Sequence, residues 1–293
     1  MTTVLLVAVM TLLFSFQSLF CKLFSAKYKS GDAAMTSTVF SIAYGAFAGV
    51  ATLVLAGFRF APSGLTLGLG LLNAVTLLVY NTAMIQASRG GSYSFQMLCM
   101  LFGAIVLPML HEVIFLGGTL TAVQLIAIAI MLVSFVLMNL QGLSLKGSTK
   151  KFLFWCAALF ISNGLYSIVM NLQQLRLAGG ERNEMITLSY LGMSVMYAVV
   201  QMCRDRKSLA AGFRIGKEPL IYLLACCVCA TVAAHMMLYV LSLVDATILY
   251  TIDNGGVLVL SVLYSRFLFK EKITPIKAVA VVMAIISIVM LSA

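Results

Sequence analysis

Ten long runs of apolar residues, separated by short polar connections, limit most strongly how this chain can fold. A bilayer core of roughly 30 Å is crossed by about 20 helical residues, so 293 residues have room for about ten crossings. Hydrophobic residues make up 62% of the chain and charged residues 10%, which is more apolar surface than a water-soluble core could bury. The sequence therefore predicts an all-α membrane protein with ten transmembrane helices.

The predicted helices form two groups of five, on either side of the polar linker QGLSLKGSTKK. The first group covers residues 3–21, 33–56, 65–87, 92–116 and 122–140, and the second covers residues 152–173, 185–202, 220–243, 246–268 and 275–291. The chain thus divides into two five-helix units, residues 1–145 and residues 146–293.

The two units resemble each other in sequence. LLFSFQSLF in the first predicted helix aligns with ALFISNGLY in the sixth, which pairs Gln17 with Asn163 at a separation of 146 residues. A second alignment, from the end of each unit, pairs Thr121 with Thr274 at a separation of 153 residues. Because each unit has an odd number of helices, the second copy should lie inverted in the membrane. Such repeats can exchange shapes and open a central cavity to one side at a time, which favours alternating-access transport.

The basic residues are distributed unevenly between the connections. Sixteen of the 19 Lys and Arg residues lie in the odd-numbered connections, and only Arg59, Arg176 and Arg182 lie in the even-numbered ones. Basic loops stay in the cytoplasm, so this census predicts that both termini lie outside. The formal charge of +10 then reflects orientation in a plasma or inner membrane, and we expect no nucleic-acid partner. The start, MTTVLL, lacks the features of a secretory signal and is interpreted as the first span.

Other sequence patterns argue against several further classes. The seven cysteines lie within apolar stretches, where a thiol behaves as a small hydrophobic group, so we predict no disulfide framework. Only His235 accompanies the cysteines at 226–229, so we predict no metal site and expect no cofactor. The chain has no Gly-rich phosphate loop, which argues against ATP-driven transport, and no HExxH or GxSxG pattern, which argues against an intramembrane enzyme.

Taken together, the five-plus-five arrangement, Pro108 in LPMLHEVIFLGGTLT and the FKEKIT motif at 269–274 resemble the EamA-type drug/metabolite transporter superfamily over essentially the whole chain. FKEKIT is similar to the family's apolar-x-Glu-x-apolar-Thr signature, whereas the first unit keeps only GGTLT, without Glu. The resemblance implies a ten-helix transporter whose cavity is lined by the first, third, fourth, sixth, eighth and ninth helices. It also implies cytoplasmic termini, against the charge census, which we keep as the prediction. Trp155 is the single Trp, whereas family members commonly carry Trp in both the first and sixth helices.

Asp253 is the strongest functional candidate because it is a carboxylate within an apolar helix. It lies about seven residues into the ninth predicted helix, on the order of 10 Å below the interface, where a charge is expensive. Asn254 adds hydrogen-bonding capacity, and Gly255 and Gly256 each weaken the helix by roughly 1 kcal/mol, so a local break there would expose backbone carbonyls. The functional interpretation is cation binding or proton exchange; the alternative is a neutral carboxylic acid that holds helices together.

Further polar and aromatic side chains could line a central cavity or hold helices together. Gln17 and Asn163 occupy equivalent places in the two copies, but interhelical amide bonds are also common and contribute about 0.6 kcal/mol in membranes. Tyrosine faces attract amines through cation–π interactions, yet tyrosine is also a frequent interface residue. The predicted substrate-binding residues are Gln17, Tyr80, Asn81, Asn163, Tyr166, His235, Tyr239, Tyr250, Asp253 and Asn254.

Three residues are candidates for proton coupling: Asp253, His235 and Glu112. His235 can accept a proton near neutral pH, although a lone His often bridges helices instead. Glu112 lies near the end of its helix and matters only if it points inward. The sequence thus predicts a secondary transporter for a small polar metabolite, acting as a monomer or homodimer in the lipid bilayer. The alternatives are a non-transporting receptor or scaffold and, less favoured, an intramembrane enzyme.

Overall fold

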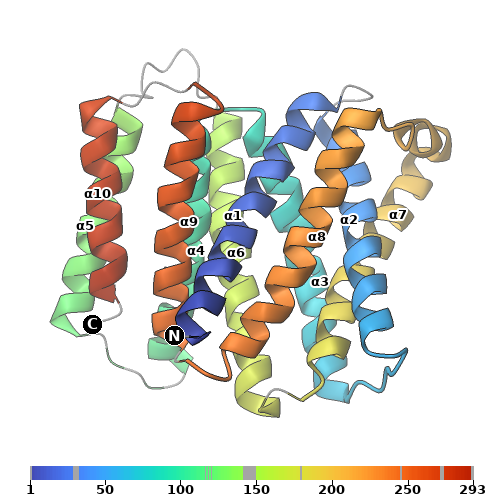
Figure 1. The fold of residues 1–293 in the computed structure, drawn as a ribbon, viewed down its shortest axis with the longest axis horizontal. Coiled ribbons are helices and arrows are strands. Elements are labelled where there is room, and N and C mark those ends of the chain that lie inside the picture. Colours follow the sequence, from blue (N-terminus) through green and yellow to red (C-terminus); the bar gives the residue numbers. More distant parts are fainter. Residues whose placement is uncertain are drawn as a thin grey trace.

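The structure, a computed structural model, describes residues 2–28, 33–115, 117, 119, 121–140, 150–178, 180–244, 246–270 and 274–291. These residues contain ten α-helices and no strand, which confirms the all-α prediction (Figure 1). The helices are α1 (Thr2–Lys27), α2 (Ala33–Leu55), α3 (Gly64–Ser88), α4 (Tyr93–Phe115), α5 (Ala122–Leu140), α6 (Lys150–Leu177), α7 (Arg182–Gly212), α8 (Lys217–Val240), α9 (Ala246–Phe267) and α10 (Pro275–Leu291).

The helices have the length and surface of a membrane protein. Within the described residues, α1, α2, α3, α4, α6, α7 and α8 are long and apolar enough to cross a bilayer, and shorter apolar helices lie in α5 and α10. Many apolar side chains on the outside of the bundle are about half exposed, among them Leu71, Ile161 and Val195. Such a surface is unsuited to water and matches lipid, so the chain is a multi-pass membrane protein.

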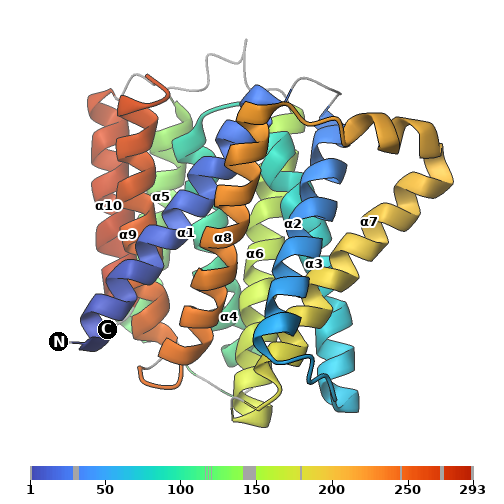
Figure 2. The same cartoon turned by 45° about the vertical axis from the view of Figure 1, so that its right-hand side comes forward.

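Two helices extend furthest beyond the apolar runs that predicted them. α1 continues to Lys27, and α7 continues to Gly212 with non-helical backbone at Asp205, where the helix bends and its last part runs back towards α2 (Figure 2). There the Tyr28 hydroxyl donates to the carbonyl of Gly212 at 2.7 Å. Both extensions contain basic residues, which end an apolar run without ending the helix. Hydropathy marks where the apolar run ends and gives no signal for the helix that follows it.

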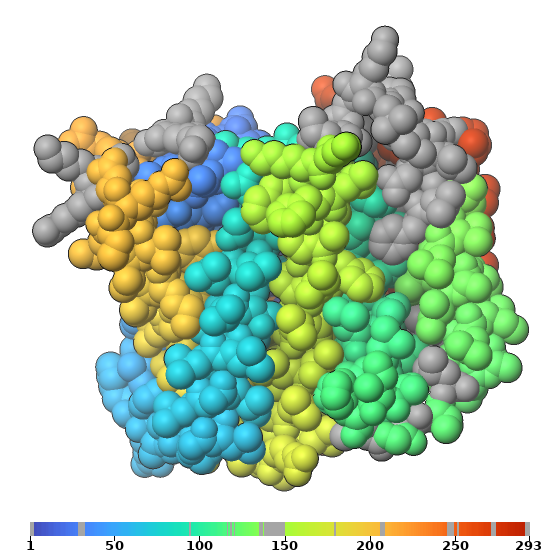
Figure 3. Space-filling view, turned by 180° about the vertical axis from the view of Figure 1, so that it is seen from behind, coloured from blue at the N-terminus to red at the C-terminus, as the bar shows by residue number. Residues whose placement is uncertain are grey.

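The packing between helices repeats in pairs. α2 packs against α7, α5 packs against α10, and the α1–α8 contact has a counterpart in α3–α6. The α5–α10 pair stands at one edge of the molecule (Figure 1), while α3, α6 and α4 lie edge to edge on the face seen from behind (Figure 3). The main hydrophobic core lies between these groups and surrounds the cavity described below.

Two hydrogen bonds between α5 and α10 are reciprocal. Ser134 Oγ donates to the carbonyl of Ala280 at 2.6 Å, and Ser287 Oγ donates to the carbonyl of Ala127 at 2.6 Å. Ser287 and Ala280 lie 153 residues after Ser134 and Ala127, respectively, which is the separation found between the ends of the two units. Each helix thus donates from its serine to the alanine carbonyl of the other helix. A two-fold contact between like elements produces this reciprocal pattern.

Glycines bring α4 and α6 into close contact. A Cβ atom at Gly103 would overlap the carbonyl of Phe160, and one at Gly164 would lie 2.5 Å from the carbonyl oxygen of Gly103. Small residues allow membrane helices to approach in this way. The approach places the Asn163 amide against α4, where its Nδ2 donates to the carbonyl of Met100 at 2.9 Å.

Candidate functional site

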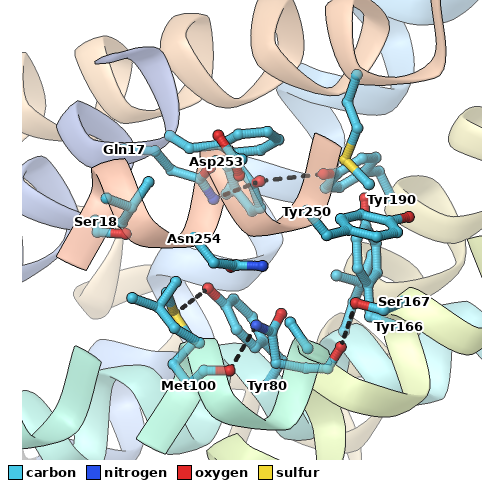
Figure 4. Close-up of a pocket in the computed structure, with 18 residues that line it drawn as sticks. Gln17, Ser18, Tyr80, Met100, Tyr166, Ser167, Tyr190, Tyr250, Asp253 and Asn254 are labelled. Carbon is cyan, nitrogen blue, oxygen red and sulfur yellow. Dashed lines mark hydrogen bonds between the residues drawn. The ribbon is translucent and has the colours of Figure 1, made fainter. Parts of the chain in front are cut away.

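A polar cavity lies within the bundle, between helices from both halves of the chain (Figure 4). Its volume is about 90 Å³, taken as the space open to the centres of water-sized spheres. Eight helices contribute to it, including α2 and α7 in addition to the six that the family resemblance implies. The lining residues are Phe14, Gln17, Ser18, Tyr44, Leu77, Tyr80, Met100, Leu101, Ala104, Asn163, Tyr166, Ser167, Tyr190, Met237, Tyr250, Asp253, Asn254 and Val257.

Asp253 supplies the only carboxylate of the lining, and no Lys, Arg or His lines the cavity in the described part of the chain. Its Oδ1 accepts a hydrogen bond of 2.8 Å from the Thr11 hydroxyl of α1. This bond depends on Gly256, because a Cβ atom there would lie 2.6 Å from the Thr11 methyl group. Among the described residues, the site therefore combines one partly buried acidic group with the Thr11 hydroxyl as its hydrogen-bond donor and no opposing cation.

The expected weakness at Gly255 and Gly256 does not interrupt the helix. α9 runs without a break from Ala246 to Phe267, so the carbonyls near Asp253 remain in helical geometry. Two glycines cost roughly 2 kcal/mol in helix propensity, and packing within a bundle offsets that amount readily. At Gly256 the missing side chain instead permits the close approach of α1.

Two further polar groups beside the carboxylate have no hydrogen-bond partner among the described residues. They are the Nδ2 of Asn254, whose side chain is only 5% exposed, and the hydroxyl of Tyr250. Tyr250 and Asn254 are four residues apart on α9, so they share a helix face. Figure 4 shows Asn254 pointing into the space between α9 and Tyr80. Unpartnered polar groups in a buried position are costly and call for a ligand or water.

Five tyrosines from five helices form the aromatic part of the wall. Tyr44 of α2 accepts from Gln17 Nε2 at 3.3 Å and donates to the hydroxyl of Tyr190 on α7 at 3.3 Å. The two tyrosine rings meet edge to face, with their centroids 5.3 Å apart. The Tyr80 hydroxyl lies 3.1 Å from Met100 Sδ, and Tyr166 and Tyr250 complete the set.

The structure brings together seven of the ten predicted substrate-binding residues. Gln17, Tyr80, Asn163, Tyr166, Tyr250, Asp253 and Asn254 all line the cavity. Asn81 does not: it is 2% exposed, and its Nδ2 lies 2.9 Å from Met193 Sδ in the α3–α7 contact. Neighbouring residues on a helix point about 100° apart, and on α3 that difference turns Tyr80 to the cavity and Asn81 to α7.

His235 and Tyr239 line a different cavity, between the start of α7 and the end of α8. Its volume is about 370 Å³, and its other lining residues are Glu181, Arg182, Asn183, Glu184, Ile186 and Leu238. His235 Nδ1 lies 2.8 Å from the carbonyl of Thr231, which can only accept, so Nδ1 carries the proton. Tyr239 is 53% exposed, and neither side chain reaches Asp253.

Two carboxylates lie near the helix ends on the outside of the bundle. Glu112, near the end of α4, is exposed and does not line the cavity. Glu181 precedes α7 with a left-handed φ of 55° and accepts from the backbone N–H and hydroxyl of Ser63, at 2.8 and 2.9 Å. Hydrogen bonds from Thr66 and Ser63 hold the pKa of Glu181 below its usual value, so it stays anionic and links α7 to the start of α3.

Sequence reasoning missed Tyr44, Tyr190, Ser18 and Ser167, all of which line the cavity. The predicted repeat offered a signal for the tyrosines, since Tyr190 lies 146 residues after Tyr44, as Asn163 does after Gln17. The predicted separation of 153 residues pairs positions on α4 with positions on α9. Met100 and Asp253, which both line the cavity, are 153 residues apart.

Comparison with known proteins gives a family for the second half of the chain. Residues 151–293 match the EamA-like transporter family, which agrees with the resemblance carried by the sequence motifs. No curated protein matches the chain. Twenty-eight chains of solved structures match it, and one of them, described only as "Crystal structure of protein", is 13% identical over 99% of this chain and 96% of its own, with a TM-score of 0.66. At that identity the likeness shows the fold alone.

Proposed function

Because residues 151–293 belong to the EamA-like transporter family, we propose that the whole chain is a secondary transporter that carries a small polar metabolite, an amino acid or an amine, by alternating access. The family match supports the general part of this proposal, a membrane transporter of the drug/metabolite type with a small-molecule solute in a lipid bilayer. The solute class and the mechanism are the specific parts that we add. We propose that both termini lie outside, from the charge census alone, and we keep the plasma or inner membrane and a monomer or homodimer as expectations.

The observation that carries the proposal is the isolated carboxylate of Asp253 in the central cavity. A charge at the centre of a membrane helix costs about 2.5 to 3.5 kcal/mol or more. The Thr11 hydroxyl offsets part of that cost, since a hydrogen bond to a charged group contributes about 1.5 to 3 kcal/mol. The carboxylate therefore requires either a proton or a positively charged solute, and exchange between the two would couple transport to a proton gradient.

Alternating access requires two states that resemble each other, and the proposed inverted repeat provides them. The reciprocal Ser134 and Ser287 hydrogen bonds and the Tyr44–Tyr190 contact support a two-fold axis between residues 1–145 and 146–293. Elements related by such an axis in the membrane plane can exchange their packing, which closes one mouth of the cavity as the other opens.

In this proposal seven residues contact the solute, and Asp253 alone exchanges the proton. The contacts are made by Gln17, Tyr80, Asn163, Tyr166, Tyr250, Asp253 and Asn254. We leave His235 and Glu112 out of the coupling role because neither lines the cavity, and among the described residues tyrosines are the only other titratable side chains that do.

The test is transport in proteoliposomes by the Asp253→Asn variant. The amide keeps the shape of the carboxylate but cannot hold the charge, so concentrative flux should fall to the rate of protein-free liposomes while the helical content is retained. Glu112→Gln is the matched control: it removes an exposed carboxylate and should transport like the wild type. Unchanged flux in Asp253→Asn would exclude Asp253 from the mechanism, and saturable binding without flux in the wild type would favour a receptor.

A further inference from the structure

We infer that the solute of the central cavity is an organic monocation, an amine that carries no carboxylate of its own. This inference rests on the proposed function and narrows it, because that function leaves amino acids and amines equally open. Three features of the lining carry it: its charge, its aromatic surface and its remaining hydrogen-bond donors.

The charged groups of the cavity suit a solute that has one positive group and no negative group. Asp253 is the single acidic residue of the lining, and no Lys, Arg or His accompanies it in the described part of the chain. Two basic side chains of the described residues lie elsewhere: Lys22 Nζ is 4.6 and 4.1 Å from the ring centroids of Tyr93 and Phe269, and Arg182 lines the other cavity. A zwitterion would bring a second negative charge into this low-dielectric space with no cation to meet it.

The aromatic surface suits a cation that carries apolar groups. Tyr44, Tyr80, Tyr166, Tyr190 and Tyr250 contribute rings from five helices, and Phe14 adds a sixth. Aromatic faces attract ammonium groups and their alkyl substituents, most strongly where water is excluded. A bare metal cation prefers several oxygen ligands and would make no use of the apolar area of these rings.

The donors of the wall are mostly committed within the protein. Gln17 Nε2 donates to Tyr44, Tyr44 to Tyr190, and Asn163 Nδ2 to the α4 backbone. The two groups without a partner, Asn254 Nδ2 and the Tyr250 hydroxyl, lie on the same helix as Asp253 and close to its charge. A carboxylate placed there would be repelled by the nearby charge of Asp253. The uncharged oxygen of a hydroxyl or ether would not be repelled. The arrangement therefore matches an amine with a neutral oxygen nearby.

The size of the cavity agrees with a small solute. A water molecule needs about 10 to 15 Å³ of space open to its centre, so the available 90 Å³ holds several waters or one compact organic molecule. Ethanolamine and serine form a matched pair within this limit, since serine is ethanolamine with an added carboxylate. Ethylene glycol, which replaces the ammonium group with a hydroxyl, is the neutral member of the series.

The experiment measures binding and flux separately with the full-length wild-type protein. Calorimetry and thermal shift in detergent compare ethanolamine, serine and ethylene glycol, and a second pair, phenethylamine and phenylalanine, probes a larger size. We expect each amine to bind at least tenfold more tightly than its amino acid, and ethylene glycol not to bind. Equal or tighter binding of the amino acids, stabilisation by sodium or potassium ions only, or no binding by either amine would overturn the inference.

Counterflow in proteoliposomes separates failure of this inference from failure of the transport proposal. Serine exchange without ethanolamine exchange would leave a transporter whose solute class is wrong. Ethanolamine binding without flux would agree with the proposed solute class and contradict the proposal that the protein transports it.

A pair of variants then tests the aromatic contribution. Tyr166→Leu removes a ring of the cavity and should weaken amine binding by about tenfold, a change of 1.4 kcal/mol. Tyr222→Leu removes a ring that stacks on Phe20 outside the cavity and should leave amine binding within twofold of the wild type. Equal effects of the two substitutions would contradict a cation–π role for the wall.

Discussion

The α4–α6 contact and the α1–α9 contact occupy corresponding places in the two halves of the chain but are held together by different chemistry. α4 and α6 meet through Gly103 and Gly164, and an amide donates to the backbone at Met100. In α1 and α9, Gly256 allows the approach, and a hydroxyl donates to the Asp253 carboxylate. Gly256 and Asp253 lie 153 residues after Gly103 and Met100, respectively.

Both contacts depend on a glycine that lets the helices approach, and only the α1–α9 contact has a carboxylate as well. Met100 and Asp253 are each the eighth residue of their helices, so the same contact is built once with an apolar thioether and once with a carboxylate. α4 also packs on α6 more extensively than α9 packs on α1. The charge is therefore not required for packing, and we expect the weaker α1–α9 contact to be the one that opens during transport.

Replacing Asp253 with the residue of the corresponding position gives the largest expected effect. Asp253→Met should reduce concentrative flux at least tenfold, to the rate of empty liposomes, because the described lining holds no other carboxylate that could exchange a proton or pair with a cation. It should also raise the melting temperature, since removing a charge from a membrane interior relieves about 2.5 to 3.5 kcal/mol or more. A lower melting temperature would mean that the carboxylate is structural and that the two contacts are not equivalent.

Adding one methyl group to each contact should show how tightly it is packed. Gly103→Ala forces a Cβ atom into the Phe160 backbone, so we expect a loss of about 1 to 3 kcal/mol or more in unfolding free energy. Gly256→Ala meets the Thr11 side chain, which can shift, so its stability loss should be smaller while its flux falls. Gly255→Ala is the control: its nearest neighbour would be 3.7 Å away, and it should gain up to about 1 kcal/mol. Denaturation in mixed detergent measures all three variants.

The fold was predictable because the bilayer sets the length of each helix. The apolar runs predict helices whose bounds mostly differ from those in the structure by a few residues, and only the polar extensions of α1 and α7 escaped. The acidic site was predictable for the same reason, since a carboxylate has few tolerable places in a membrane. The seven lining residues that were named lie on helices whose polar residues are few.

The direction in which each helix faces was not predictable. A helix that is apolar all round gives no sign of which side meets lipid and which meets its neighbours. Asn81 and His235 consequently face away from the cavity that their helices border, while Tyr44 and Tyr190, on helices outside the six that the resemblance implied, face into it. The separation of 146 residues between Gln17 and Asn163 also separates Tyr44 from Tyr190, whose hydroxyls are in contact, so the proposed repeat offered a signal for both tyrosines.

Removing the hydroxyl that holds the carboxylate should have an intermediate effect. Thr11→Val keeps the shape of the side chain and deletes the hydrogen bond to Asp253, which contributes about 1.5 to 3 kcal/mol to the charged form. Because the anion binds the solute, we expect apparent affinity to fall about tenfold with little change in helical content. Thr52→Val, which removes a hydroxyl that bonds only within α2, should leave affinity unchanged. Equal affinities for the two variants would show that Thr11 does not support the anion.

The smallest expected effect tests the symmetry on which the comparison depends. Ser134→Ala and Ser287→Ala each remove one of the two reciprocal α5–α10 hydrogen bonds, and interhelical bonds of this kind average about 0.6 kcal/mol in membranes. If the two halves are related by a two-fold axis, the two losses in unfolding free energy should agree within about 0.3 kcal/mol, and the double variant should lose their sum, since the two sites share no partner. Flux should be unaffected because neither helix lines the cavity. Clearly unequal losses would indicate that the two bonds only resemble each other in geometry, and the correspondence between α4–α6 and α1–α9 would then lose its main support.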